Sequence, residues 1–251
     1  MLQRFFEPPW PKIFTITGLS MVALSIITVA YFKILAPRSF SEVGFLSPLV
    51  DHLPILGAQT APVTRPIVFG FLPFWNFKYA SNFRYQLLTH IAFFGLDFDG
   101  QGNIRTRLPD GNQEPGWTAY QSQAFGSIIR QARLHGTKII LVLLAMDQTT
   151  IETIINRSAN QQRLIDHIIE VIDLKNLDGI NLDFEYAGTP TATVKNQFTQ
   201  FVHNLSTQLK HRYPRLELSI DVFADTATKY RIWDLPQIAS SVDQVIIMAY
   251  D

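Results

Sequence analysis

The chain has 251 residues, with 21 basic and 21 acidic side chains and 47% hydrophobic residues, which is enough for one packed domain and an additional segment. The charge is balanced and Lys and Arg form no cluster, which argues against nucleic acid as the main partner, because phosphate binding depends on clustered basic residues. The absence of cysteine excludes disulfides, zinc-thiolate sites and cysteine nucleophiles.

The first predicted element is an apolar helix near the N-terminus. Residues 13–32 read IFTITGLSMVALSIITVAYF and carry no charge. About 20 apolar residues suffice to cross a membrane, whereas the apolar core of a cleaved signal peptide has about 7–15. We therefore predict a transmembrane signal-anchor over residues 13–35, preceded by a cytoplasmic segment over residues 1–12. Two basic residues precede the apolar run and two follow it, so charge determines the orientation only weakly.

The next segment, residues 36–66, is predicted to be a Pro-rich linker. It contains five prolines and shows no sustained helical or strand period. Its apolar patches either dock on the domain or the membrane surface or stay free, and the residues leave both alternatives open.

From residue 67 onward, short apolar runs alternate with longer amphipathic stretches, a pattern typical of a parallel sheet wrapped by crossover helices. The predicted fold class is therefore α/β, as a barrel or a doubly wound sheet. The predicted strands are residues 67–75, 90–97, 138–145, 179–185, 216–223 and 244–250. The predicted helices are residues 79–88, 117–135, 150–174, 191–212 and 232–240. Residues 99–103 (DGQGN) predict a hairpin after the second strand.

The fourth predicted strand carries a polar stripe. Side chains alternate along a strand, so Asn181, Asp183 and Glu185 share one face, which would point into a barrel lumen. Barrel enzymes keep their chemistry at the carboxyl ends of the strands. A like-charge neighbour and partial burial should raise the pKa of one carboxyl, which gives a protonated acid beside an ionised partner. Such a pair suits cleavage of a glycosidic bond.

A simpler interpretation is that these acids only end a strand and cap the next helix. Capping accounts for one acid but not for a stripe of three polar residues on an otherwise apolar strand, because uncompensated buried carboxylates are costly.

Three segments resemble glycoside hydrolase family 18, the chitinase-like family. Its fourth-strand signature Asp-Gly-x-Asp-x-Asp-x-Glu stands here as residues 178–185 (DGINLDFE), which start with Asp178 and Gly179. Residues 248–251 (MAYD) are similar to the family's sixth-strand Met-x-Tyr-Asp, and residues 69–75 (FGFLPFW) to the first strand of its spore-cortex and peptidoglycan-cleaving branch. The resemblance covers residues 67–251 and implies a (β/α)8 TIM barrel.

The resemblance also implies a retaining, substrate-assisted mechanism without metal or other cofactor. Glu185 would be the general acid and then the base, while Asp183 would orient the 2-acetamido group of the substrate. Tyr250 would hydrogen-bond the acetamido carbonyl, and Met248 and Asp251 would line the sugar subsite. Asn181 and Trp75 are further predicted substrate contacts, the latter by stacking on a sugar ring at the end of the first strand.

The sequence departs from the family pattern in several places. Asn181 stands where most members have the middle Asp, so we expect that Asp183 cannot share a proton with a carboxylate beneath it. The third strand lacks the usual Ser-x-Gly-Gly. Only six strands are predicted where a closed barrel has eight, so we expect a chain truncated after strand six. Asp97 and Asp221 either point into the cleft or cap helices, and neither is assigned a catalytic role.

The leading hypothesis is a glycosidase that cleaves β-linked N-acetylglucosamine glycans of the peptidoglycan or chitin type. The motif favours a domain on the extracytoplasmic side of a single-pass membrane protein, and an anchor beside a cell wall places peptidoglycan ahead of chitin. The alternative is a non-catalytic glycan-binding domain on the same fold. The presence of both Glu185 and Tyr250 favours the enzyme.

Overall fold

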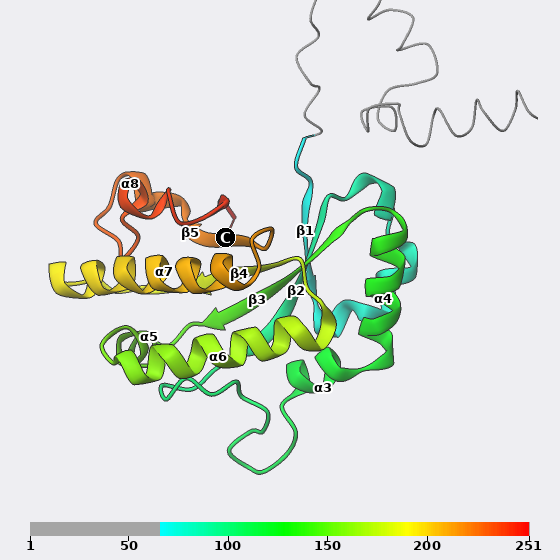
Figure 1. Cartoon of the computed structure of the whole chain (residues 1–251), viewed down its shortest axis with the longest axis horizontal. Helices are drawn as coiled ribbons and strands as arrows, with labels where there is room; N and C mark the ends of the chain where they lie inside the picture. The colour runs from blue at the N-terminus through cyan, green and yellow to red at the C-terminus, as the bar shows by residue number, and fades with distance from the viewer. Residues whose placement is uncertain (1–65, 251) are drawn as a thin grey trace, which may run out of the picture. The chain divides into compact units, whose positions relative to one another are not determined.

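The computed structural model describes residues 66–250, which form one α/β unit around a single parallel sheet. The sheet has six strands in the order β1-β2-β3-β4-β5-β6, so each strand pairs with the next one in the chain (Figure 1). The strands are β1 (Phe69–Pro73), β2 (His90–Asp97), β3 (Lys138–Ala145), β4 (Gly179–Phe184), β5 (Glu217–Phe223) and β6 (Gln244–Met248). This sequential parallel order is that of a curled α/β sheet, as in part of a TIM barrel.

The connections are helical and lie around the strands (Figure 1). The α-helices are α3 (Pro115–Gln121), α4 (Gln123–Leu134), α5 (Gln148–Ile155), α6 (Ser158–Lys175), α7 (Ala192–Arg212) and α8 (Leu235–Ile238). The 3-10 helices are η2 (Phe74–Asn82), η3 (Tyr85–Leu87) and η4 (Ala224–Ala227).

The strand predictions are confirmed. β2 and β3 have the predicted bounds, and the other strands are one to four residues shorter than predicted. The predicted hairpin after β2 is also confirmed, since Phe98 and Ile104 form an antiparallel bridge. Asp99 closes this hairpin by accepting hydrogen bonds from the backbone N–H groups of Gln101 and Asn103, both at 2.9 Å.

One helix prediction is confirmed, since α7 covers residues 192–212 of the predicted 191–212, and the other four were wrong in continuity, length or type. The helix predicted over residues 117–135 is divided at Ser122, whose backbone is extended and whose hydroxyl accepts from the Phe125 N–H at 3.2 Å. The helix predicted over residues 150–174 is likewise two helices, α5 and α6, and the predicted helix 232–240 is only the short α8. The helix predicted over residues 79–88 is replaced by η2 and η3, because the backbone at Phe83 is extended.

The two faces of the sheet have different surroundings. The outer face packs against the helices, and β4 contributes Ile180, Leu182 and Phe184 to this core, all fully buried. The inner face holds a small separate apolar cluster of Ala92, Ile140 and Val142. The alternation predicted for β4 is therefore confirmed, since its apolar side chains pack outward and its polar ones lie on the opposite face.

The predicted signal-anchor over residues 13–35, the segment 1–12 and nearly all of the linker 36–66 lie outside the described residues. Among the helices of residues 66–250, none combines the length and apolar character needed to span a bilayer.

Gly179 at the start of β4 should tolerate no side chain. A Cβ there would lie 2.6 Å from the Glu217 carbonyl oxygen and 2.6 Å from Ile140 Cδ1, closer than such atoms can approach. We expect Gly179→Ala to lower the free energy of unfolding by about 2–3 kcal/mol, measured by urea denaturation. Gly126→Ala on α4 is the matched control, because a Cβ there has no neighbour nearer than 3.8 Å. It should gain about 0.5–1 kcal/mol, and equal effects of the two substitutions would contradict the argument.

Candidate functional site

Asp178 and Gly179 set the position of β4 between its neighbours. The Asp178 carboxylate accepts the backbone N–H of Ile139 at 2.8 Å, and the Asp178 carbonyl accepts that of Glu217 at 3.0 Å. Asp178 thus links the starts of β3, β4 and β5. The absence of a side chain at Gly179 lets β5 approach closely. The first two residues of the motif therefore have structural roles.

The polar stripe on β4 is deeply buried. Asn181 is 0% exposed and Asp183 is 3% exposed. Parallel pairing places Val142 of β3 beside Asn181, and Leu144 beside Asp183. The side of the stripe that faces β3 is therefore apolar and supplies no compensating charge.

Glu185 follows β4 directly and is half-buried. Its backbone N–H donates to the Ala145 carbonyl at 2.8 Å, which extends the β3–β4 pairing by one residue. The next residue, Tyr186, is buried, and its hydroxyl donates to Glu152 of α5 at 2.5 Å while accepting from Gln148 at 2.8 Å. The backbone at Glu185 is therefore fixed on one side by β3 and on the other by Tyr186, which is hydrogen-bonded to α5. Glu185 lies at the carboxyl edge of the sheet.

The structure adds Asp221 to the site. It lies on β5, is 2% exposed, and accepts a hydrogen bond from Asn181 Nδ2 at 2.9 Å. Ser219 on the same strand accepts a second bond from that nitrogen at 3.1 Å. Asp221 therefore points into the polar layer and caps no helix. The expectation that Asp183 cannot share a proton with a carboxylate beneath it considered β4 alone. The structure places a second buried carboxyl, Asp221 of β5, near enough for its charge to raise the pKa of Asp183.

Burial and like charge raise the pKa of both buried acids. The pKa of Asp183 rises from 3.8 to about 7, chiefly because the side chain is desolvated and then because of the charges of Asp221 and Glu185. Desolvation also raises the pKa of Asp221 to about 7, against the Asn181 hydrogen bond, which favours the charged form. The sequence predicted one carboxyl with a raised pKa at this site, and the site contains two, Asp183 and Asp221.

Tyr250 lies within the field of these acids. Its pKa is raised by burial and then by the charges of Asp183, Asp221 and Glu185, although the residue is 75% exposed. Met248 ends β6, where it pairs with Phe223 of β5. Asp251, the last predicted contact, lies outside the described residues. The structure thus brings the sixth-strand segment to the same edge as the acids of β4.

Trp75 lies in the first turn of η2, directly after β1. The residue is 56% exposed, and its ring meets the ring of Phe94 edge-on, with the centroids 6.1 Å apart. Phe94 borders the inner apolar cluster of the sheet. The indole is therefore fixed by aromatic packing and offers much of its surface to solvent, as a stacking platform requires.

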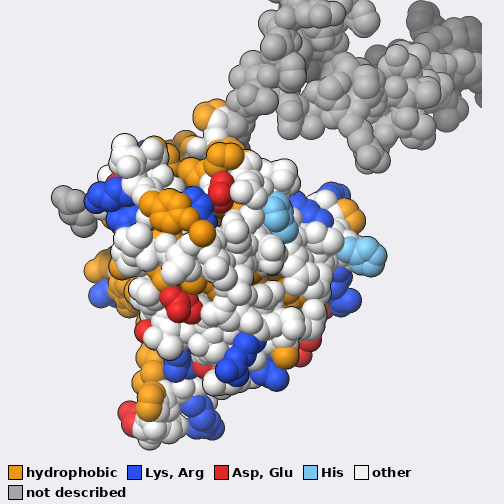
Figure 2. All heavy atoms as spheres, turned by 90° about the vertical axis from the view of Figure 1, so that its left-hand side faces the viewer, with side chains coloured by type: hydrophobic (Ala, Val, Ile, Leu, Met, Phe, Trp, Pro, Cys, Tyr) orange, Lys and Arg blue, Asp and Glu red, His pale blue; other side chains and the backbone are white. Residues whose placement is uncertain are grey.

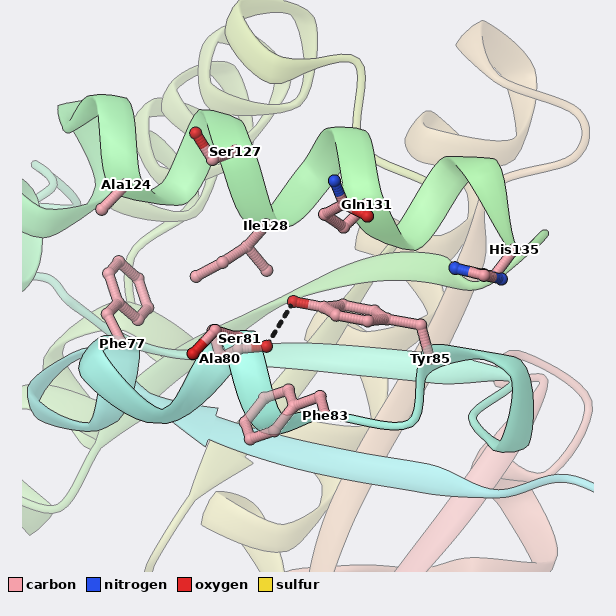
Figure 3. A pocket seen from close by; sticks show the side chains of 10 residues that line it. All are labelled: Phe77, Ala80, Ser81, Phe83, Tyr85, Ala124, Ser127, Ile128, Gln131 and His135. Carbon is pink, nitrogen blue, oxygen red and sulfur yellow. Dashed lines mark hydrogen bonds between the residues drawn. The ribbon is translucent and has the colours of Figure 1, made fainter.

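A pocket lies away from these acids, between α4 and the η2–η3 segment (Figure 3). Tyr85 crosses it, donates its hydroxyl to the Ala80 carbonyl at 3.0 Å and stacks on His135. No carboxylate lines this region, so it lacks the acid pair that glycosidic cleavage needs.

The left-hand side of Figure 1 is turned toward the viewer in Figure 2. Acidic, basic and apolar side chains are interspersed on this face, and neither sign of charge forms a large patch on it. This face therefore presents no basic patch of the kind that binds a polyanion such as nucleic acid.

Comparison with known families identifies the family to which the chain belongs. The model of the family described as glycosyl hydrolases family 18 matches residues 67–251.

Solved structures share the fold. The Bacillus cereus spore cortex-lytic enzyme SleL aligns with a TM-score of 0.55 and 17% identity, over 73% of this chain and 41% of its own. A family 18 chitinase mutant from Cycas revoluta, in complex with (GlcNAc)4, gives 0.60 and 18%, over 74% and 55%. A Bacteroides thetaiotaomicron chitinase gives 0.60 and 20%, over 75% and 55%. This chain therefore spans about half the length of these proteins, or less.

The raised pKa of Asp183 should make the stability of the domain depend on pH. Between its unfolded value of 3.8 and its folded value of about 7, the folded state binds more protons than the unfolded chain. The contribution to stability is therefore complete below about pH 4 and is lost as the pH rises through about 7. We expect Asp183→Asn to gain about 1–3 kcal/mol of unfolding free energy at pH 8 relative to wild type, and little at pH 4.

Urea unfolding at pH 4, 6 and 8 measures this difference. Asp166→Asn, at an exposed position of α6, removes one carboxylate outside the site and should show no such trend. A difference between Asp183→Asn and wild type that stays constant with pH would refute the electrostatic argument.

Proposed function

The chain belongs to glycosyl hydrolases family 18, and from this premise we propose that it acts as a retaining glycoside hydrolase on β-linked N-acetylglucosamine glycans, with Glu185 as general acid and base. The observation that carries the proposal is the buried acid layer at the carboxyl edge of the sheet. Asp183 is buried behind Glu185, and Tyr250 senses the charge of both acids. Burying carboxylates without a neighbouring cation destabilises the folded state. A catalytic role would explain why the protein keeps these acids in spite of that cost.

In the proposed first step, the carbonyl oxygen of the substrate's own 2-acetamido group attacks the anomeric carbon. The glycosidic C–O bond breaks, its electron pair goes to the leaving oxygen, and that oxygen takes the proton from Glu185. An oxazolinium ion forms, with its positive charge on the former acetamido group. In the second step Glu185 takes a proton from water, whose oxygen attacks the anomeric carbon and opens the ring with retention.

Asp183 is suited to the charge that develops between these steps. A carboxyl whose pKa is about 7 is close to half-protonated at neutral pH, so a small change in the local field changes its state. A neutral Asp183 adds no second negative charge to the buried layer before the reaction. An adjacent oxazolinium cation would favour loss of the proton, and the resulting carboxylate would stabilise that cation.

Tyr250 and Trp75 complete the proposed subsite. The Tyr250 hydroxyl would donate to the acetamido carbonyl and aim its oxygen at the anomeric carbon, while Met248 and Asp251 line the subsite. Trp75 would stack on the apolar face of a sugar, and Asn181 would support Asp183 from below. Because Asn181 is fully buried, it would act on the substrate through Asp183 and not by direct contact.

We further propose that the domain works outside the cytoplasm, held to a membrane by residues 13–35. The support for this is the uncharged run of residues 13–32 and a glycan substrate of the cell-wall type. The same placement favours peptidoglycan over chitin as substrate.

Removal of the acid should separate turnover from binding. We expect Glu185→Gln to lower the hydrolysis of N-acetylglucosamine oligomers or peptidoglycan by about a thousandfold or more, because neither leaving-group protonation nor water activation remains. Oligomer affinity should stay within about twofold of wild type, measured by calorimetry. Glu170→Gln, at an exposed position of α6, is the matched control and should retain full activity. Equal turnover by Glu185→Gln and wild type would exclude this mechanism, and binding without turnover by wild type would favour a glycan-binding domain.

Trp75 should contribute to affinity rather than to chemistry. We expect Trp75→Ala to weaken oligomer binding about tenfold, which corresponds to about 1.4 kcal/mol of lost stacking. Tyr79→Ala is the control, because Tyr79 is another exposed aromatic residue of η2, at 50% against 56% for Trp75. If both substitutions weakened binding equally, the effect would belong to η2 as a whole and not to a sugar platform at Trp75.

A further inference from the structure

The inner polar layer extends over two neighbouring strands. Asn181 of β4 pairs in register with Ser219 of β5, and Leu182 with Ile220. Asp183 and Asp221 are the next residues along these two strands, and they face the same side as Asn181 and Ser219. These four polar side chains are no more than 3% exposed. Two carboxyl groups therefore lie close together out of water.

The Asn181 amide is fixed by β5. Its nitrogen donates to Ser219 Oγ at 3.1 Å and to Asp221 Oδ1 at 2.9 Å. The reverse orientation would set the amide oxygen against the Asp221 carboxylate, where two acceptors repel each other. Asn181 can therefore offer only its oxygen to the rest of the site.

Two acceptor oxygens of this polar layer have no hydrogen-bond partner among the described residues. They are Asn181 Oδ1 and Asp183 Oδ1, and both are buried. An amide oxygen carries no proton, so of these two groups only Asp183 can supply a hydrogen atom. A protonated Asp183 lowers the cost of burying this layer, because a buried acceptor without a donor is expensive.

Of the two buried acids, Asp221 is the one that should ionise first. Its charged form accepts the hydrogen bond from Asn181, which lowers its pKa against the effect of burial. Asp183 Oδ1 receives no comparable hydrogen bond, and the charge of Asp221 raises the pKa of Asp183. The pair therefore loses its protons in two steps, of which the first belongs mainly to Asp221.

The groups that face this pair are few. Glu185 at the end of β4 adds negative charge to both acids, and Tyr250 after β6 responds to them. β3 presents Leu144 beside Asp183, and β6 presents Ile246 beside Asp221, so neither flanking strand supplies a charge at this level. Among the described residues, no cation acts on the pKa of either acid.

We propose that Asp221 is a positioning residue of this site, the ionised carboxylate on β5 that orients the Asn181 amide and keeps the proton on Asp183 until a cation forms beside it. The proposal rests on the proposed function for its catalytic consequence. The β5 carboxylate, which is hydrogen-bonded to the β4 amide, then supplies the negative charge that an acid at position 181 of β4 would have supplied.

A carboxyl titration tests the proposal without requiring activity. The full chain is labelled with 13C-aspartate, and the side-chain carboxyl signals are followed by NMR from pH 4 to pH 9. Asp183→Asn and Asp221→Asn assign the two signals by their loss. We expect the Asp183 midpoint to fall by about one pH unit or more in Asp221→Asn, because one like charge is removed from a buried site. An unchanged midpoint would overturn the proposal.

Two controls separate charge from structure. Asp166→Asn removes an exposed carboxylate, and Ser219→Ala removes the other Asn181 acceptor without removing charge. Both should leave the Asp183 midpoint within a few tenths of a pH unit. If Asp221→Asn does not fold, the wild-type titration still decides, because the proposal requires Asp221 to ionise at lower pH than Asp183. The reverse order would contradict it.

Hydrolysis by the same variants separates this proposal from the proposed function. We expect the pH profile of kcat to shift for Asp221→Asn with little change in KM, and to stay in place for Asp166→Asn. A chain that shows the coupled titration but no hydrolysis would sink the glycosidase proposal alone. Hydrolysis with an Asp183 midpoint indifferent to Asp221 would sink the positioning role alone.

Discussion

The feature on which the site depends is the burial of two carboxyl groups side by side in the concave face of a parallel sheet. Asp183 and Asp221 are at most 3% exposed, and the nearest groups from β3 and β6 at their level are apolar. Burial of such a pair makes the free energy of folding less favourable, because each group must lose its hydration and the two repel each other when charged. The remaining structure has to compensate for this cost and hold the pair in place.

The outer core supplies that compensation. Along β4 the alternate residues pack outward, where the ring of Phe184 contacts those of Phe198 and Phe201 on α7. A single strand thus joins the polar face that carries the acids to a tightly packed apolar face, and displacement of one would displace the other. The contacts around Asp178, Gly179 and Tyr186 restrain β4 at both ends, so Glu185 stays beside the buried pair.

The sequence predicted those parts of the fold that follow from strong periodicity. Residues 90–97 and 138–145 are strands with the predicted bounds, because apolar runs bounded by turn residues leave little choice. The breaks in the helices were missed, since a single capping hydroxyl at Ser122 outweighs an otherwise continuous helical pattern. The family resemblance was confirmed. Asp221 was named from the sequence but left without a role, because the motif lies on β4, although Ser219 and Asp221 form a second polar stripe by the same alternation.

That second stripe changes the meaning of Asn181. Taken alone, an amide in place of an acid removes a charge from the site. Placed beside β5, the same amide provides the hydrogen-bond donor that Asp221 receives from β4. A carboxylate at position 181 would instead add a third buried acid beside Asp183 and Asp221, with Glu185 nearby. The acids would then repel one another more strongly, and among the described residues no cation acts on the pKa of Asp183 or Asp221 to offset this repulsion. Asn181 and Asp221 are therefore best understood as one unit, in which the donor on one strand allows the charge on the other.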